Sequence, residues 1–386
     1  MSLLRQSLVV SGLNLRSLGQ RLGSSFVIVV GMACVVGVLL SMLSATAGML
    51  RAFQNSGDPS RAIAVPAQVR GNAKEGITRE TIGTILNAPG IAKGRDGDVL
   101  GDGEVDQQLP PAEGFAEGSL QLLGIGPAGT SLRPQFRIVA GRMFHSGRHE
   151  VIVGVGAERV FGVRIGQNVR TLRSGWPVVG VFSDGGGILE SLLMADVDAV
   201  MSTWKRTNYD RVLVRLDSAA AFDGFNRWLT TNPALSVNAL QERDYYLLMG
   251  NQRTPFFTAM AYLVGAIMAV GAFVGAMRIM YAAVNFRIRE IATLRAIGYE
   301  PIPVAVSVIV ECAALSLCGA AIGAFAAWLM FDGKHSSLGA EIFDLYVSPQ
   351  LVAVGLGWAL LIAVLGGLLP AVRAARLPVA DAMRAG

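Results

Sequence analysis

Cysteine, histidine and charged residues are all scarce in this sequence. Charged residues make up 16% of the 386 positions, whereas soluble domains usually carry about 25%. The three cysteines, Cys34, Cys312 and Cys318, lie inside apolar runs, so we interpret them as small buried hydrophobes. Because the long polar segment contains no cysteine, a disulfide framework or a cysteine zinc site is excluded there.

The sequence also lacks the common motifs of nucleotide binding and hydrolysis. No GxxxxGK[ST] motif is present, and Gly333-Lys334 has neither the upstream glycine nor the following hydroxyl of a P-loop. HExxH, GxSxG and CxxC are absent too. These absences argue against an enzyme with its own catalytic or cofactor site.

Histidine occurs three times, as His145, His149 and His335. The spacing of His145 and His149, four apart and beside Glu150, is that of two metal ligands on one helical face. Gly147 lies between them, however, and GRMFHSGRHE is typical of a loop that leads into a strand. We therefore predict that this chain binds no metal.

Apolar residues, in contrast, are abundant and are gathered in four runs. The chain is 52% hydrophobic, and its mean hydropathy is +0.48. Each run is long enough to cross about 30 Å of hydrocarbon: 26–50, 255–278, 302–331 and 351–369. A cleaved signal peptide ending near Ala45-Thr46-Ala47 is the alternative for the first run. Its apolar core is longer than the usual signal-peptide core, which favours a membrane span.

The segments between the runs differ in charge. Residues 1–25 hold three arginines and no acid, and their leucines fall on one face of a predicted amphipathic helix. Residues 279–300 and 370–386 are also rich in arginine, whereas the short loop 332–350 is net acidic. The positive-inside rule then places both ends of the chain in the cytoplasm and residues 51–254 outside. The net charge of +5 therefore reflects orientation in the membrane, not nucleic-acid binding.

Residues 51–254 are predicted to form a mixed α/β domain. Strands are expected over 62–69, 120–125, 150–153, 168–172, 177–182 and 211–216, and helices over 78–86, 157–161, 219–230 and 242–251. Thr78 is the expected N-cap of the first helix. Residues 96–118 carry many Gly, Asp and Pro and predict an irregular loop. The fold class is thus an α-helical membrane protein with four transmembrane helices plus a large extracytoplasmic α/β domain between helices 1 and 2.

A short polar segment, FRIREIATLRAIGYE, separates the second and third runs at residues 286–300. Ile288, Ile291 and Leu294 are three apart and share one face of a predicted helix. Gly298 can end that helix in a left-handed C-cap, and Pro301 blocks its continuation. We interpret it as a cytoplasmic helix that receives force from another protein. The alternative is an ordinary basic loop that obeys the positive-inside rule.

Two features inside the runs also predict specific contacts. Glu311 is the only charge of the third run, so it either hydrogen-bonds a neighbouring helix or the interface, which we favour, or lies on a proton or substrate path. The glycine pairs Gly271/Gly275 and Gly319/Gly323 have the spacing that lets helices approach closely. We expect these pairs to contribute to packing in a dimer.

In this order, the segments resemble one known family. The most specific stretch is REIATLRAIGYEP at 289–301, followed by Glu311 with its Leu/Gly-rich continuation and the closing LLPAVRAARLPVADAMR at 368–384. The outer segment adds FRIVAGRMF, EVIVGVGAERVFGVRIGQNV and VVGVF. The chain resembles the FtsX/MacB-type permeases of ABC transporters, also called the type VII or mechanotransmission family. Residues 96–118 depart from the family pattern.

The resemblance implies a function and a set of partners. Two permease copies would form a homodimer in the inner membrane lipid, each docked on a separate ABC ATPase subunit that binds ATP and Mg²⁺. The residues expected to contact that ATPase are Arg287, Arg289, Glu290, Ile291, Leu294, Arg295 and Gly298. A hydrophobic compound, a peptide or a lipoprotein would be exported, with a periplasmic adaptor as a further partner. The alternative is an FtsX-like regulator that drives a cell-wall hydrolase and moves no solute.

Overall fold

The computed structural model describes residues 6, 22–67, 76–94, 96–109, 120–170, 175–232, 234–286, 288–297, 299–338 and 341–376. The chain divides into two compact units. The helical unit comprises Met1–Ala47, Pro255–Lys334 and Tyr346–Gly386, and the sheet unit comprises Gly48–Thr254 and His335–Leu345. The amphipathic helix predicted over 1–25 falls largely outside the described residues, as does most of the predicted tail 370–386.

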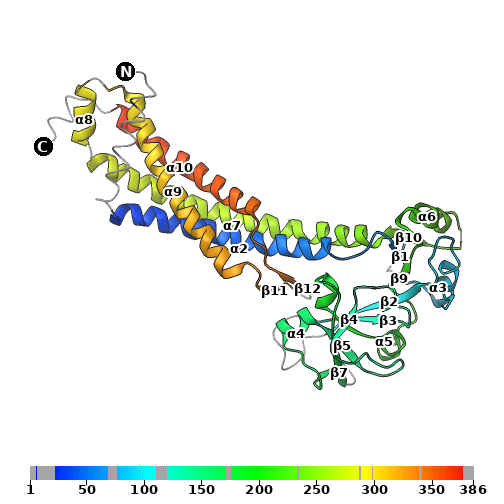
Figure 1. Cartoon of the computed structure of the whole chain (residues 1–386). Coiled ribbons are helices and arrows are strands. Elements are labelled where there is room, and N and C mark those ends of the chain that lie inside the picture. Colours follow the sequence, from blue (N-terminus) through cyan, green and yellow to red (C-terminus); the bar gives the residue numbers. More distant parts are fainter. Residues whose placement is uncertain are drawn as a thin grey trace. The chain divides into compact units, whose positions relative to one another are not determined.

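Four long helices dominate the helical unit (Figure 1). They are α2 (Leu22–Gln54), α7 (Glu242–Phe286), α9 (Pro301–Phe331) and α10 (Pro349–Arg376). Within the described residues, these four are long and apolar enough to cross a membrane. A shorter helix, α8 (Ile288–Ala296), lies between α7 and α9 in the chain. Helix α7 continues from the predicted 242–251 helix into the second apolar run without a break, with Pro255 inside it.

Small and aliphatic side chains hold the four helices together. Leu40 of α2, Ala276 of α7, Cys312 of α9 and Ala363 of α10 belong to one buried cluster. Many large apolar side chains on the outside of the unit stay exposed, such as Ile267, which is 65% exposed. Exposed apolar surface of this kind suits a protein surrounded by lipid rather than by water.

The sheet unit contains ten strands in one mixed sheet, as far as the structure describes it. The strand order is β10-β1-β9-β2-β3-β8-β5-β7-β4, and β6 also pairs with β7. The strands are β1 (Arg61–Pro66), β2 (Gly101–Gln108), β3 (Gln121–Ile125), β4 (Arg137–Gly141), β5 (Val151–Gly154), β6 (Asn168–Arg170), β7 (Gly175–Ser183), β8 (Leu193–Asp196), β9 (Arg211–Arg215) and β10 (Val237–Gln241). A separate hairpin of β11 (His335–Leu338) and β12 (Glu341–Asp344) completes the unit.

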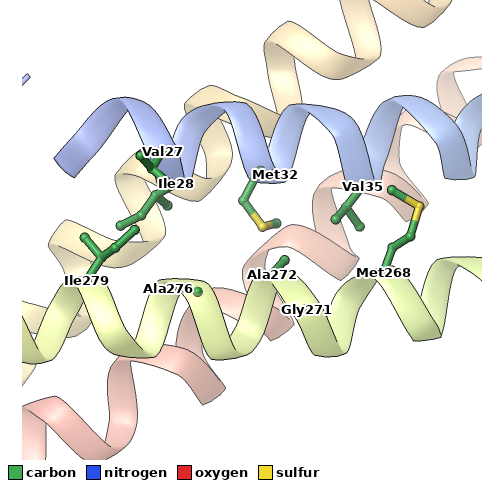
Figure 2. Close-up of a pocket in the computed structure, with 11 residues that line it drawn as sticks. Val27, Ile28, Met32, Val35, Met268, Gly271, Ala272, Ala276 and Ile279 are labelled. Atoms are coloured by element: carbon green, nitrogen blue, oxygen red, sulfur yellow. The ribbon is translucent and has the colours of Figure 1, made fainter. Parts of the chain in front are cut away.

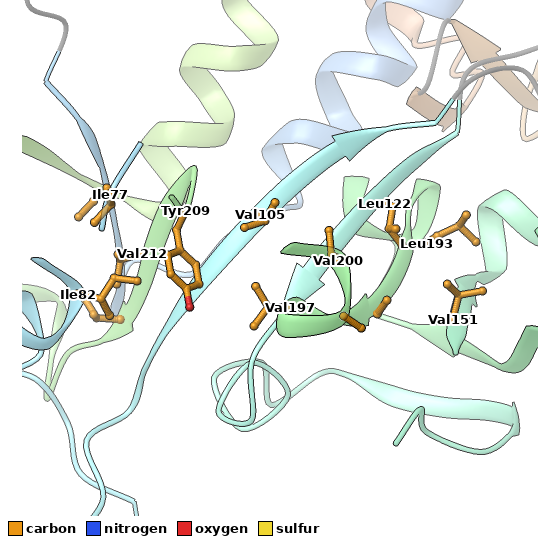
Figure 3. Packing of buried hydrophobic residues seen from close by; sticks show 14 of the residues in the cluster. Ile77, Ile82, Val105, Leu122, Val151, Leu193, Val197, Val200, Tyr209 and Val212 are labelled. Atoms are coloured by element: carbon orange, nitrogen blue, oxygen red, sulfur yellow. The ribbon is translucent and has the colours of Figure 1, made fainter. Parts of the chain in front are cut away.

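Among the described residues, the helices that cover this sheet besides α7 are α3 (Arg79–Ile85), α4 (Val155–Phe161), α5 (Val197–Trp204) and α6 (Phe222–Thr231). The connections described include the short 3₁₀ turns η2 (Ile188–Ser191) and η3 (Ala219–Ala221). The main core lies between helices and sheet, where Ile82, Val105, Val200 and Val212 pack together (Figure 3). Burial of such side chains is the main favourable contribution to folding.

Several local predictions are confirmed. Thr78 caps α3, and its hydroxyl accepts a hydrogen bond from the Thr81 N–H at 3.2 Å. The strands expected near residues 62, 120, 150, 168, 177 and 211 are all present as β1, β3, β5, β6, β7 and β9. The helices expected at 157–161 and 219–230 correspond to α4 and to η3 with α6.

One predicted loop is wrong. The segment 96–118, expected to be irregular, contains β2, which lies between β9 and β3 in the sheet. Its sequence GDGEVDQQ looks like a loop because alternate positions are acidic, but ion pairs with arginines hold Glu104 and Asp106 in the strand. The short loop expected at 332–350 lies between α9 and α10 in the chain and contains the β11–β12 hairpin. Strands β4, β8 and β10 and helix α5 were not predicted.

Candidate functional site

The predicted coupling segment forms helix α8. Ile291 and Ala292 are buried, 7% and 2% exposed, and Ile291 belongs to the apolar cluster of the helical unit. One face of α8 is therefore held by the helices around it, as the three-residue spacing of its apolar positions predicts. Arg289, Glu290, Leu294 and Arg295 lie within the helix, but their side chains are not described; Arg287 and Gly298 lie outside the described residues. Contact of these residues with an ATPase stays a prediction.

Glu311 lies inside the helical unit and not on its outer surface. Its exposed fraction is 5%, and the neighbouring Ser307 and Cys312 are buried as well. A carboxylate at this depth is costly unless protein groups surround it. Burial among helices is compatible with both alternatives, so the hydrogen bond to a neighbouring helix or the interface and the proton or substrate path both stay hypotheses.

The structure separates the two glycine pairs of the helical unit. A β-carbon added at Gly319 would lie 2.4 Å from the Val29 carbonyl oxygen, and one added at Gly323 would lie 2.3 Å from that of Ala33. The helix that packs closely against these two glycines is therefore α2 of the same chain. A β-carbon at Gly271 or Gly275 would meet no heavy atom within 4 Å. Of the four glycines predicted to contribute to a dimer contact, Gly271 and Gly275 on α7 are the pair that remains open for it.

Gly271 lines an apolar groove between α2 and α7 (Figure 2). Gly275 lines the same groove. The groove has a volume of about 310 Å³. Its lining is Val27, Ile28, Gly31, Met32 and Val35 from α2, and Met268, Gly271, Ala272, Gly275, Ala276 and Ile279 from α7. None of these lining side chains is charged, so the groove suits an apolar side chain or an acyl chain rather than an ion.

The sheet unit contains a buried ionic cluster that the sequence analysis did not identify. Glu104 of β2 accepts hydrogen bonds from Arg133 at 2.5 Å and from Arg211 at 2.7 Å, and its side chain is 1% exposed. Burial alone would raise the pKa of Glu104, but the two guanidinium groups outweigh burial and hold this pKa at about 2. Glu104 is therefore ionised at neutral pH.

A second ion pair of this cluster involves the first residue of α7. The Glu242 carboxylate accepts hydrogen bonds from Arg61 Nε at 2.5 Å and from the Asp58 N–H at 2.9 Å. Arg61 also donates to the Leu132 carbonyl at 3.0 Å. Arg61 and Glu242 are 2% and 0% exposed. The start of α7 is thus tied to β1 by a buried charge pair.

One signal in the sequence could have revealed this cluster. Asp102, Glu104 and Asp106 are two apart, so a strand would place them on one face. Arg211 begins another predicted strand and supplies a cation for such a face. Acids at alternate positions of one segment can indicate a strand whose carboxylates form ion pairs with arginines of other segments, and not only a turn.

His145 and His149 lie in different environments. His145 Nδ1 lies 3.1 Å from Glu150, whose carboxylate also binds Arg142 at 2.7 Å and 2.9 Å. His149 packs beside Trp176, with ring centroids 4.9 Å apart. Within the described residues there is no group of three or more His, Cys, Asp or Glu side chains that could hold a metal ion.

Comparison with known proteins identifies the family of this chain. A family profile described as the MacB-like periplasmic core domain matches residues 25–231, more than half of the chain. A second, described as the FtsX-like permease C-terminal, matches residues 262–379. The chain belongs to the FtsX/MacB-like family of ABC transporter permeases. The resemblance inferred from the motifs is thereby confirmed.

Individual relatives of this permease are more distant. It is 28% identical over 230 residues to the macrolide export ATP-binding/permease protein MacB of Hahella chejuensis, covering 57% of this chain and 35% of that protein. It is 31% identical over 130 residues to the protein of the same name from a Shewanella species, covering 34% of this chain and 20% of that protein. The chain thus spans about a third or less of the length of these relatives.

A solved structure is similar as well. The extracellular domain of the noncanonic ABC-type transporter YknZ from Gram-positive bacteria aligns with 16% identity and a TM-score of 0.36. The alignment covers 47% of this permease and 99% of that chain.

Proposed function

We propose that this permease couples ATP hydrolysis by a separate nucleotide-binding subunit to motion of the sheet unit, and that this motion exports a hydrophobic compound, a peptide or a lipoprotein. The permease acts as a homodimer in the inner membrane, with its termini in the cytoplasm and the sheet unit in the periplasm. It contributes no catalytic residue. A periplasmic adaptor completes the export route.

The observation that carries this proposal is the continuity of α7. This helix begins in the sheet unit at Glu242, continues as an apolar helix long enough to cross a membrane, and ends at Phe286, shortly before α8 begins at Ile288. Because helices resist bending, a push on α8 reaches the sheet unit through one element instead of a series of loops. The partly buried face of α8 ties that push to the helical unit.

The apolar lining of the α2–α7 groove supports a hydrophobic substrate or a lipid-attached one, because no lining residue would pair with a charged solute. The names of the two MacB relatives, which are macrolide export proteins, support export rather than regulation of a hydrolase.

A single charge on α8 should uncouple the complex. We expect Leu294→Asp or Arg295→Asp to reduce permease-dependent ATPase activity by about tenfold or more. Arg295→Asp reverses a charge expected at the contact with the ATPase, and Leu294→Asp puts a charge on the apolar face of α8. The measurement is ATPase activity of the co-purified complex in lipid nanodiscs, together with export from vesicles.

Leu248→Asp is the matched control for Leu294→Asp. Leu248 lies on α7 within the sheet unit and is 46% exposed, so the same change there should leave assembly with the ATPase intact. Normal ATPase stimulation by both α8 variants would refute the coupling role. Normal stimulation by the wild type without export, together with capture of a hydrolase, would favour the regulatory alternative.

Opposite orientation of the sheet unit and the C-terminal tail can be tested by labelling. In a chain whose three cysteines are replaced by alanine, a cysteine at the exposed Ser218 should react with a membrane-impermeant maleimide in intact spheroplasts. A cysteine at Arg384, in the tail outside the described residues, should react only after permeabilisation. Labelling of both sites from one side would overturn the topology.

A further inference from the structure

The ionic cluster lies on one face of three adjacent strands, β1, β9 and β2. On the opposite face, Ala62, Val212 and Val105 belong to the main apolar core. The charged face also includes groups from the elements around these strands. They are Asp58 before β1, Arg61 on β1, Asp102, Glu104 and Asp106 on β2, Arg133 in the loop after β3, Asp184 and Glu190 after β7, Arg211 on β9, and Glu242, Tyr245 and Tyr246 on α7. The first turn of α7 is therefore seated on charged groups.

Carboxylates outnumber guanidinium groups in this cluster. Asp102, Glu104, Asp184 and Glu242 are buried, as are Arg61, Arg133 and Arg211, and Asp106 and Glu190 add two half-buried carboxylates. The arginines hydrogen-bond Glu104, Asp106 and Glu242. Within the described part of the chain, Asp102 and Asp184 receive no hydrogen bond from an arginine.

Asp102 and Asp184 are held in place by the backbone around them. Asp102 faces the tight turn at Gly126–Gly129, where a β-carbon on Gly126 would lie 2.2 Å from its Oδ1. Asp184 begins a turn with positive φ at Gly185 and Gly186, and Glu190 fixes this turn by accepting hydrogen bonds from the Asp184 and Gly186 N–H groups. One oxygen of each aspartate, and Glu242 Oε1, find no partner among the described residues. Neither aspartate can move easily towards water.

We propose that this cluster is a proton-binding joint: protons on Asp102 and Asp184 determine how tightly the first turn of α7 is held on the sheet. When the two aspartates are neutral, they do not compete for the arginines, so Arg61 pairs with Glu242 and Arg133 pairs with Glu104. When they are ionised, they attract the same arginines, and Asp184 also repels Glu242. The Arg61–Glu242 ion pair that holds the first turn of α7 on the sheet is then weaker.

The direction with pH follows from burial. Burial raises the pKa of Asp102 to about 7, with nearby Glu104 adding to the effect, and raises that of Asp184 to about 6. A carboxyl group whose folded pKa lies above its unfolded value stabilises the fold most at low pH. That contribution is lost as pH rises through the folded pKa. The joint should therefore be tighter at about pH 5 than at about pH 8.

Hydrogen exchange of the full-length protein in detergent micelles tests this joint. After correction for intrinsic exchange rates, amides of residues 243–250 should be protected about tenfold more at about pH 5 than at about pH 8, the equivalent of one pKa unit. In the Asp102→Asn/Asp184→Asn variant, the high protection should persist at both pH values. Asp198→Asn, which removes an exposed carboxylate of the same unit, should keep the wild-type response.

Two results would overturn the proposal: equal corrected protection of wild-type residues 243–250 at both pH values, or a full pH response in the double variant. If the double variant does not fold, the infrared spectrum of the wild type decides. A carbonyl stretch from a protonated carboxylic acid should disappear as pH rises from about 5 to about 8, and should be weaker in Asp102→Asn alone. A wild-type spectrum without that band refutes the joint.

Discussion

Glu104→Ala is expected to lower the free energy of unfolding of the sheet unit by about 3–5 kcal/mol, because it leaves Arg133 and Arg211 buried without their shared carboxylate. Both arginines point at Glu104 from separate elements, and all three side chains are nearly inaccessible to solvent. Thermal or urea unfolding of the full-length protein, followed by near-ultraviolet circular dichroism, measures the change.

Asp198→Ala provides the control for Glu104→Ala. The Arg79–Asp198 pair has nearly the same distance, 2.6 Å against 2.5 Å, but its side chains are 74% and 63% exposed. Its removal should cost less than about 1 kcal/mol. Because the folded pKa of Glu104 is about 2, its contribution is present at neutral pH and is lost only as the solution becomes strongly acidic. Equal destabilisation by the two variants would show that burial does not set the strength of these pairs.

Gly323→Ala is expected to destabilise the helical unit by about 1–3 kcal/mol, because the new β-carbon would collide with backbone atoms of α2. Its nearest neighbours would be the carbonyl oxygen, Cα and carbonyl carbon of Ala33, at 2.3, 2.9 and 3.0 Å. Backbone atoms cannot rotate away as the end of a side chain can, so α2 and α9 must separate. The thermal aggregation temperature of the detergent-solubilised protein measures this loss.

Gly275→Ala makes the same chemical change at an open position. Nothing lies within 4 Å of its added β-carbon, and alanine favours a helix over glycine by about 1 kcal/mol. The variant should therefore be as stable as the wild type or slightly more stable. If Gly275→Ala lowered stability while Gly323→Ala did not, the assignment of α2 as the partner of α9 would be wrong. A weaker dimer with unchanged monomer stability would support the predicted role of Gly275 at the contact between copies.

Much of this fold could be predicted from the sequence, because its strongest signals are local. Length and apolarity alone indicate the four long helices. Thr78 marks the start of α3 because its hydroxyl accepts a hydrogen bond from a free N–H group of the first helical turn, as N-cap residues do. The spacing of Ile288, Ile291 and Leu294 predicts α8. Each of these signals depends on neighbours within a few residues in the chain.

The failures depend on partners that are distant in the chain. Strand β2 was mistaken for a loop because Glu104 and Asp106 pair with arginines that are distant in the chain: Arg133 and Arg211 lie 29 and 107 residues away from Glu104. The partner of Gly319 and Gly323 could not be predicted either, since glycine spacing shows that a helix approaches but not which one. The ATPase contact depends on another molecule and stays a prediction.

The β11–β12 hairpin has a practical consequence for exchanging parts between such permeases. Ile342 of this hairpin is 6% exposed within the core of the sheet unit, and its N–H and carbonyl both bond the Ser191 hydroxyl. A transplant of residues 48–254 alone would leave that hydroxyl and the surrounding apolar surface uncovered. A functional chimera must therefore carry residues 335–345 from the same donor, although some 80 residues of helix and connection separate the two pieces in the chain.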